Sequence, residues 1–327
     1  MTERRPRVSV GLPVYNGEAY LAQAIEAVRA QTLVDWELVI SDNGSTDRTA
    51  EICSHYAAQD ARVRLERQEN NRGAAWNFNR VFELSRGELF KWAAHDDLCA
   101  PDFLARCVAV LDADPSVVWC HSRFVTIDPA GSIVEGPFGR WYDACIAAGR
   151  DPDRDDDWGP ADRSAARRYR AILLGGTWGV DAFGVMRSEA LRRTRLLLPV
   201  YGAEKILLCE LALQGRYREL PAPLFQMRVH EAGSGALGTA AAQQAYVAPG
   251  AGSPRSARLR LLRAFATAIA RHPLPLAERA ACTGALAAYV LQVRKWPQAA
   301  RQILRGAGVG GSYRPLLERL RSQGKQA

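Results

Sequence analysis

The sequence lacks any hydrophobic run long enough to cross a membrane. Its longest apolar stretch, at about residues 284–293, falls well short of the ~18 residues that a spanning helix needs. No apolar segment follows the charged residues 1–5, so we expect no secretory signal. The sequence therefore predicts a cytoplasmic chain.

The sequence also lacks a Cys-x-x-Cys pair. Its seven cysteines are scattered and odd in number. This distribution disfavours a disulfide framework or a zinc site and favours small buried side chains in a reducing compartment.

Acidic residues are scarce in the C-terminal part. Residues 250–327 contain 14 Lys and Arg but only Glu278 and Glu318 as acids, whereas residues 1–249 hold 29 basic and 33 acidic residues. We expect residues 255–327 to form a basic helical region with a solvated or partner-binding face. Peripheral contact with an anionic membrane ranks second, and nucleic acid third because interleaved aromatics are missing. A helical cap that completes the core of the preceding domain is the alternative.

Strand and helix patterns alternate through the first part of the chain. A length of 327 residues with 48% hydrophobic composition allows one large domain, or one domain and an appendage. Strands are predicted at 8–12, 36–40, 63–66 and 89–92, and helices at 18–31, 46–58, 74–85 and 101–113. This alternation predicts an α/β fold with a doubly wound, mostly parallel sheet.

The pattern is less regular after residue 113. Further strands are predicted at 117–125, 181–186, 217–220 and 224–229, and helices at 164–174 and 203–213. Residues 136–162, rich in Gly, Pro and Asp, are interpreted as an irregular excursion that could act as a lid. A catalytic domain over 1–232 would then be followed by a linker at 233–254 and helices at 256–271, 276–294, 297–304 and 314–321.

Three predicted strands end in polar residues. The first strand leads into Tyr15 and Asn16, the second into Asp42, and the fourth into Asp96 and Asp97. Ligands of open α/β sheets bind at the carboxyl ends of the strands, so we expect these side chains to line one crevice. An aromatic ring and several acids suit a nucleotide diphosphate with a divalent metal ion.

The ordered motifs resemble those of the family-2 glycosyltransferases with a GT-A fold. The resemblance covers about residues 7–234 and includes the opening strand and loop, the Asp-Asn-Gly-Ser-Thr-Asp turn, the Asn71-Arg72-Gly73 segment and the Asp pair. It implies that the donor nucleotide is bound by Pro13, Tyr15, Asn16, Asp42, Gly44, Arg72, Asn79 and Asp96. Tyr15 would stack on the base and Asp42 would accept a hydrogen bond from a base N–H, as uracil or thymine presents.

The same resemblance implies a site for Mn²⁺ or Mg²⁺. Asp97 matches the position of the family's direct metal ligand, and Asp96 would contact the ribose or lie behind the metal. The motif in this sequence is Asp-Asp, whereas the family's motif is Asp-x-Asp. His230 resembles a histidine that closes over the metal or pyrophosphate. A surface histidine and a helix-capping aspartate are the structural alternatives.

The resemblance places the general base at Glu204, which begins a predicted helix. The helix dipole would favour its ionised form, although Glu204 could simply stabilise the helix end. Trp178 and Asp181 lie where relatives shape the acceptor pocket, and core packing would also explain Trp178.

The resemblance therefore implies an inverting, metal-dependent glycosyltransferase. It would move a sugar from a UDP- or dTDP-type donor to a hydroxyl of a carbohydrate or lipid-linked acceptor in glycan assembly. A sugar-nucleotide or glycan-binding domain without catalysis is the alternative. Nucleotidyl transfer is disfavoured because no glycine-rich phosphate loop occurs near the N-terminus.

Overall fold

The computed structural model describes residues 5–134, 162–175, 179–250 and 257–291. Trp178, the predicted excursion up to residue 161, and the helices expected at 297–304 and 314–321 lie outside the described residues. Within the described part of the chain, no helix combines the length and the apolar character needed to span a membrane.

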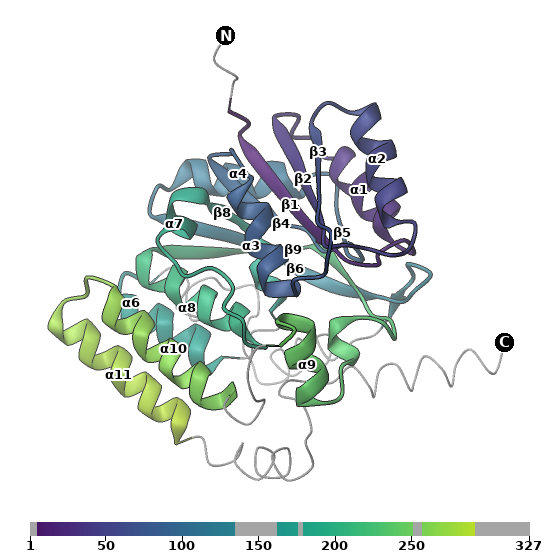
Figure 1. Ribbon diagram of the computed structural model, residues 1–327. Coiled ribbons are helices and arrows are strands. Elements are labelled where there is room, and N and C mark those ends of the chain that lie inside the picture. The colour runs from purple at the N-terminus through teal and green to yellow at the C-terminus, as the bar shows by residue number, and fades with distance from the viewer. Residues whose placement is uncertain (1–4, 135–161, 176–178, 251–256, 292–327) are drawn as a thin grey trace.

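Nine strands of the described residues form a mixed sheet at the centre of the molecule (Figure 1). Neighbouring strands follow the order β3-β2-β1-β4-β8-β6-β9-β5, and β7 pairs with β6. The strands are β1 (Val8–Val14), β2 (Trp36–Asp42), β3 (Val63–Arg67), β4 (Leu89–Trp92), β5 (Leu98–Cys99), β6 (Val117–Ile127), β7 (Ile133–Val134), β8 (Val185–Arg187) and β9 (Arg216–Arg228).

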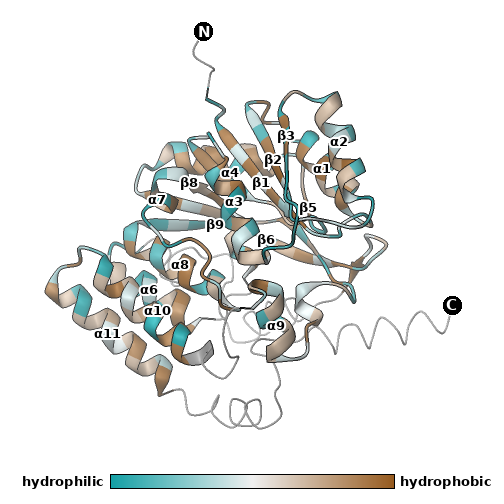
Figure 2. Cartoon of the chain, viewed as in Figure 1, coloured by the Kyte–Doolittle hydropathy of each residue, from teal (hydrophilic) through white to brown (hydrophobic). Residues whose placement is uncertain are grey.

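The first four strands form a parallel unit, in which β1 lies between β2 and β4. Every residue of β1, β2 and β4 is buried, as near-continuous apolar runs predict for parallel strands covered on both faces. Figure 2 shows the hydrophobic colouring along these central strands. β8 joins this unit to β6 through antiparallel pairs, and β6 and β9 run parallel. The predicted α/β fold is confirmed, with a mixed second half.

Helices cover both faces of the sheet. One hydrophobic core contains residues of α1 (Leu21–Arg29), α2 (Thr49–Gln59) and α4 (Phe103–Ala113). The other contains residues of α3 (Ala74–Glu83), α6 (Ala165–Leu174), α7 (Ser188–Arg192) and α8 (Ala203–Gln214). The sheet is therefore doubly wound, and its strand ends open between the two helical layers.

The last two described helices extend the second core. α10 (Ala257–Arg271) contacts α8, and α11 (Leu276–Val290) contacts α6 (Figure 1). Phe265 of α10 and Cys282 of α11 are buried in the same cluster as Trp92 of the sheet. This packing agrees with the alternative that the C-terminal helices complete the core.

The segment predicted as a linker contains regular structure. It holds the 3₁₀ helix η2 (Ser234–Ala236) and α9 (Ala240–Val247), whose Thr239 cap accepts a hydrogen bond from the Ala242 N–H. Val247 is buried, and α9 contacts α3. The Ala- and Gln-rich sequence lacks a strong helical period, which is why sequence patterning did not indicate this helix.

β9 is one long strand where the sequence predicted two. The predicted strands at 217–220 and 224–229 are joined, because β9 continues along β6 through register shifts near Ser122 and Arg123. β5 pairs only with Phe225 and Gln226 on the other side of β9. Pro221 and Pro223 lie at the irregular part of the pairing between β6 and β9, where proline is tolerated within a sheet. The strand predicted at 181–186 is also shorter, because residues Val180–Phe183 form the 3₁₀ helix η1.

Candidate active site

A cavity of about 2210 Å³ opens at the carboxyl ends of β1 and β4. Its walls come from the loops after these strands, from η1, from the start of α8 and from the end of β9. The predicted site residues that line it are Pro13, Tyr15, Asn16, Asp96, Asp97, Asp181, Glu204 and His230. The structure therefore brings most of the predicted site into one cavity.

The two neighbouring aspartates after β4 differ in their surroundings. Asp96 Oδ2 lies 2.9 Å from His230 Nε2. Burial opposes ionisation of Asp96, but the bond with His230 and the nearby His95 outweigh it and lower its pKa. Burial, together with the charge of Asp96, raises the pKa of Asp97. Two carboxylates held this closely are stabilised by a cation.

Arg228, at the end of β9, holds this acidic loop in place. Its backbone N–H donates to Asp97 Oδ1 at 2.8 Å, and its Nε donates to the carbonyl oxygen of Asp96 at 2.8 Å. The guanidinium also donates to Gln23 Oε1 and lies over the Tyr20 ring. Sequence reasoning missed this role. The available signal was the strand periodicity, which places Arg228 and His230 on one face.

The residues at this wall fit a divalent cation that also binds phosphate oxygens. Among the described residues, no three His, Cys, Asp or Glu side chains are grouped so that they could hold a metal ion by themselves. Mg²⁺ in phosphate-binding sites is usually held by one or two carboxylates, with phosphate and water supplying the other ligands. The adjacent carboxylates of Asp96 and Asp97 match that donor set. His230 Nε2 is engaged with Asp96, so the nitrogen that His230 could offer to Mn²⁺ is Nδ1.

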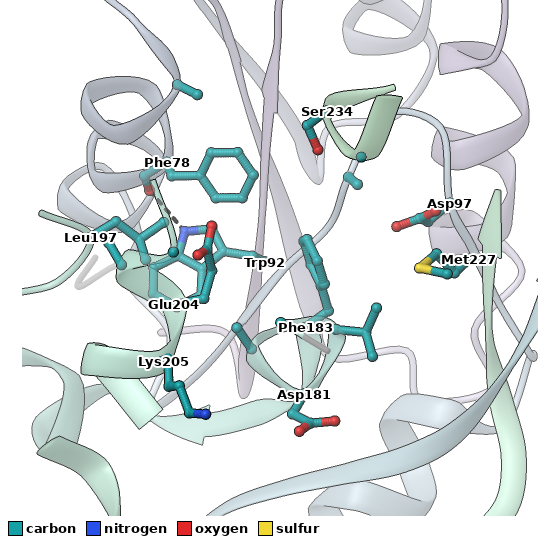
Figure 3. A pocket seen from close by; sticks show the side chains of 18 of the residues that line it. Phe78, Trp92, Asp97, Asp181, Phe183, Leu197, Glu204, Lys205, Met227 and Ser234 are labelled. Atoms are coloured by element: carbon teal, nitrogen blue, oxygen red, sulfur yellow. Dashed lines mark hydrogen bonds between the residues drawn. The ribbon is translucent and has the colours of Figure 1, made fainter. Parts of the chain in front are cut away.

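Glu204 lies at the opposite side of the cavity from Asp97 (Figure 3). It sits in the first turn of α8, after Gly202 in a left-handed conformation with φ of 84°. Burial raises the pKa of its carboxyl group, and the backbone N–H only partly offsets this effect. The expectation that the helix terminus favours the ionised form is therefore outweighed by burial. A carboxylate with a raised pKa is better matched to proton abstraction near neutral pH.

The loop after β1 presents an aromatic ring to the cavity. Tyr15 is 41% exposed, as a stacking surface must be. Asn16 adopts a positive φ of 51° and is fixed on both sides: its N–H donates to Ser45 Oγ, and its Oδ1 accepts from the Thr46 N–H. The rigid loop holds Tyr15 in an exposed position.

Asp42 lies below this loop and is fully buried. Its Oδ1 accepts the Ser45 N–H at 3.0 Å, and its Oδ2, without a hydrogen bond, lies 3.3 Å from Arg67 Nε. Asp42 thus stabilises the turn that follows β2. It does not line the cavity, and its contact with a base stays a prediction.

Gly44, Arg72 and Asn79 do not line the cavity either. Gly44 has φ of 76°, and a Cβ there would lie 2.9 Å from the Asn70 backbone, so glycine is needed for this close approach. The Arg72 guanidinium stacks on Trp76. The Asn79 amide pairs with both backbone groups of Leu197, which explains its place by packing.

Asp181 lies at the third side of the cavity, in η1 (Figure 3). Burial raises its pKa, and His121 of β6 partly opposes this shift. His121, Arg123 and Glu219 line the cavity beside it. These three residues were not predicted, although His121 and Arg123 occupy alternate positions of a largely buried strand.

Comparisons with known proteins agree with the resemblance. Residues 9–169 match the model of "Glycosyl transferase family 2". GlyG, a glycosyltransferase of Streptococcus pneumoniae, is 38% identical over 91 residues, which cover 28% of this chain and 30% of that protein. Chondroitin synthase of Escherichia coli is 31% identical over 136 residues, covering 42% of this chain and 20% of that protein. An uncharacterized protein, y4gI of Sinorhizobium fredii, is 43% identical over 112 residues, covering 34% of this chain and 12% of that protein. The matches thus span less than a third of each of these relatives.

Solved structures share the fold over most of the chain. S. aureus TarS 1-349 in complex with UDP-GlcNAc superposes with a TM-score of 0.61 and 16% identity, covering 89% of this chain and 78% of that one. The mannosyltransferase PcManGT from Pyrobaculum calidifontis, in complex with GDP-Man and Mn²⁺, gives a TM-score of 0.54 and 19% identity, covering 92% of this chain and 81% of that one. At these identities the likeness extends to the fold alone.

Proposed function

We propose, from the premise that residues 9–169 place this chain in glycosyl transferase family 2, that it is an inverting, metal-dependent glycosyltransferase. It transfers a sugar from a UDP- or dTDP-type donor to a hydroxyl group of a carbohydrate or lipid-linked acceptor in glycan assembly. The structures of similar fold in complex with UDP-GlcNAc and with GDP-Man support a nucleotide-sugar donor.

One observation carries the proposal: Asp96, Asp97 and Glu204 line the same cavity, with Asp97 and Glu204 on opposite sides of it (Figure 3). Inversion at an anomeric carbon needs the acceptor to attack from the side opposite the leaving diphosphate. The leaving group needs positive charge near it, and the attacking hydroxyl needs a proton acceptor. Asp96 and Asp97 suit the first need because they attract a cation, and Glu204 suits the second.

Glu204 acts as the general base. As the acceptor oxygen forms its bond to the anomeric carbon, its proton passes to the Glu204 carboxylate. The bond between the anomeric carbon and the diphosphate oxygen breaks at the same time, and the electron pair leaves with the diphosphate. The raised pKa of Glu204 increases its basicity for this transfer.

The opposite wall holds the donor. Tyr15 and Pro13 stack on the base, Asn16 keeps their loop in position, and Asp42 is assigned to the base edge. Asp97 and His230 would hold the metal ion, with Asp96 at the ribose or behind the metal. Bound Mn²⁺ or Mg²⁺ would neutralise the diphosphate as it leaves. Arg228 keeps the aspartate loop oriented.

A donor panel tests the proposal. The full chain is incubated with UDP-, dTDP- and GDP-sugars, with Mn²⁺ or with a chelator, and release of the nucleotide diphosphate is measured. We expect turnover of a UDP- or dTDP-sugar that requires the metal ion, and a product whose anomeric configuration is opposite to that of the donor. Binding of a sugar nucleotide without any turnover would favour the non-catalytic alternative. Turnover that persists in the chelator would refute the metal assignment.

We further propose that the reaction takes place in the cytoplasm. The basic C-terminal region is the surface we assign to peripheral contact with an anionic membrane, and this contact stays a prediction.

A further inference from the structure

A tyrosine on α9 reaches the cavity in which the proposed transfer takes place. Tyr246 lines this cavity together with Asp96 and Glu204. It belongs to the segment 233–254 that the sequence predicted as a linker, and the proposed transfer step gives it no role. Tyr246 is 44% exposed, so a ligand bound in the cavity can touch it.

The phenol of Tyr246 lies between the two walls of the cavity. Burial raises its pKa, and the negative charges of Asp96 and Glu204 raise it further, so both carboxylates are close enough to act on the hydroxyl group. The hydroxyl group also lies beside the Ser234 side chain. In Figure 3 Ser234 is seen between Glu204 and Asp97. In the proposed reaction, the sugar leaves the diphosphate in this region.

Buried contacts hold α9 in this position. Gln244 is buried, and its Nε2 donates to the carbonyl oxygen of Pro199, in the loop before α8, at 3.3 Å. Its Oε1 accepts from Arg260 of α10 at 2.7 Å. Val247, which follows Tyr246, is buried in the second core. The helix is therefore fixed by both of its neighbours, and Tyr246 is the residue that it turns toward the cavity.

The end of α9 rests on Gly73, at the start of α3. A Cβ at Gly73 would lie 2.6 Å from the Val247 oxygen and 2.6 Å from the Pro249 side chain, so this close approach requires glycine. The carbonyl oxygen of Gly73 accepts from Asn43 Nδ2 at 3.3 Å, in the turn after β2. These contacts fix the position of Tyr246 relative to the turn that the proposed function assigns to the donor.

The diphosphate that leaves in the proposed reaction gains negative charge next to an arginine that is engaged elsewhere. The Arg228 guanidinium donates to three carbonyl oxygens and one side chain, those of Asp96, Asp128, Pro129 and Gln23. A phenol with a raised pKa keeps its proton at neutral pH and can donate a hydrogen bond. A donor already in place where charge develops stabilises the transition state, because little reorganisation is needed during the reaction.

We propose that Tyr246 is a catalytic residue whose hydroxyl group donates a hydrogen bond to the β-phosphate of the nucleotide-sugar donor. This inference rests on the proposed function and adds a residue to its mechanism. As the bond between the anomeric carbon and the diphosphate oxygen breaks, the electron pair passes to the diphosphate and the hydrogen bond from the phenol becomes stronger. The proton stays on the phenol, because a diphosphate leaves as an anion.

The test removes a single hydroxyl group. Tyr246→Phe keeps the aromatic ring and removes the hydrogen-bond donor. Tyr56→Phe is the matched control, because Tyr56 carries its phenol on α2, outside the cavity lining. Thermal unfolding of each variant establishes that it is folded.

The assay follows release of the nucleotide diphosphate in Mn²⁺ without an added acceptor. The substrate is whichever of UDP-GlcNAc, UDP-glucose, dTDP-glucose and GDP-mannose the wild-type chain cleaves. Attack by water needs no bound acceptor, so a role of Tyr246 in holding the acceptor would leave this rate unchanged. Calorimetry gives the Kd of the free nucleotide diphosphate for each variant.

We expect kcat of Tyr246→Phe to fall by about 10²-fold, while the Kd of the nucleotide diphosphate changes by less than about tenfold. Tyr56→Phe should keep the wild-type kcat. The inference is overturned if folded Tyr246→Phe keeps more than a tenth of the wild-type kcat. It is also overturned if the loss lies in KM alone, which would assign the phenol to binding of the donor. If the wild type cleaves no donor, the proposed function itself fails, and the inference fails with it.

Discussion

Replacing Glu204 by glutamine separates catalysis from donor binding. The substitution keeps the size and shape of the side chain and removes the charge that accepts the proton. Loss of a general base lowers rates by about 10²- to 10⁴-fold, which corresponds to about 3–5 kcal/mol of transition-state stabilisation. We therefore expect kcat to fall by that factor while the affinity for UDP in Mn²⁺ changes little.

The structure also predicts that this variant remains stable. Burial raises the pKa of Glu204, which means that the folded protein penalises its charged form. A neutral glutamine avoids this penalty, so the free energy of unfolding at neutral pH should equal or exceed that of the wild type. An unchanged or higher free energy of unfolding would show that the loss of rate does not come from unfolding.

The assay measures steady-state release of UDP with acceptor, as a function of pH. Because only the ionised carboxylate accepts a proton, the wild-type rate should fall as the pH drops through the raised pKa of Glu204. Glu204→Gln should lose this limb of the profile. The control is Glu189→Gln, which removes a 79% exposed carboxylate paired with Arg193 on the surface. A Glu204→Gln enzyme with more than a tenth of wild-type kcat would refute the reasoning.

Three further changes test the metal wall, the C-terminal helices and one surface ion pair. The asparagine of Asp97→Asn can still accept the Arg228 N–H, so we expect this variant to fold. Calorimetry should show that Mn²⁺ no longer raises its affinity for UDP. An affinity that Mn²⁺ still raises would contradict the assignment of Asp97 to the metal ion. The Phe265 side chain is 1% exposed, so Phe265→Ala should lower the free energy of unfolding, measured in urea, by about 3–5 kcal/mol. A loss below about 1 kcal/mol would show that α10 is not part of the core. The hydrogen bonds from Arg62 lower the pKa of Asp60 to about 2, and after solvent screening at this surface pair the contribution at pH 7 should be about 1 kcal/mol. This contribution is present above about pH 4 and is lost as the pH falls through about 2. The free energies of unfolding of wild type and Asp60→Asn should therefore converge in acid. A difference between them that does not change with pH would refute this role of the pair.

The sequence predicted the parallel half of the fold and the residues at its strand ends. β1, β2 and β4 are short runs of buried residues, and such runs carry their signal locally. The polar residues after them, Tyr15 and the Asp pair, then follow from the rule that parallel strands deliver their carboxyl ends to one edge. Asp96, Asp97, Glu204 and His230 indeed line one cavity.

The features that sequence patterning missed depend on contacts between distant segments. β9 forms one continuous strand because it pairs with β6. Local sequence patterns do not reveal this pairing. The helix α9 is stabilised by its contact with α3, although its own sequence has little periodicity. The cluster of His121 with Asp181 and Glu219 joins residues that are up to 98 positions apart, so only the folded chain shows it.

During synthesis, the cavity cannot be completed until β9 has been made. The aspartates that follow β4 leave the ribosome about 130 residues before Arg228, whose N–H and guanidinium hold their loop. β4 likewise gains its second neighbour, β8, only when residues 185–187 have been made. A fragment cut at residue 169, where the match to the family model ends, would leave the edges of β4 and β6 bare and prone to aggregate. The boundary of recognisable sequence is therefore not a boundary at which this chain can be divided into an independently folding unit.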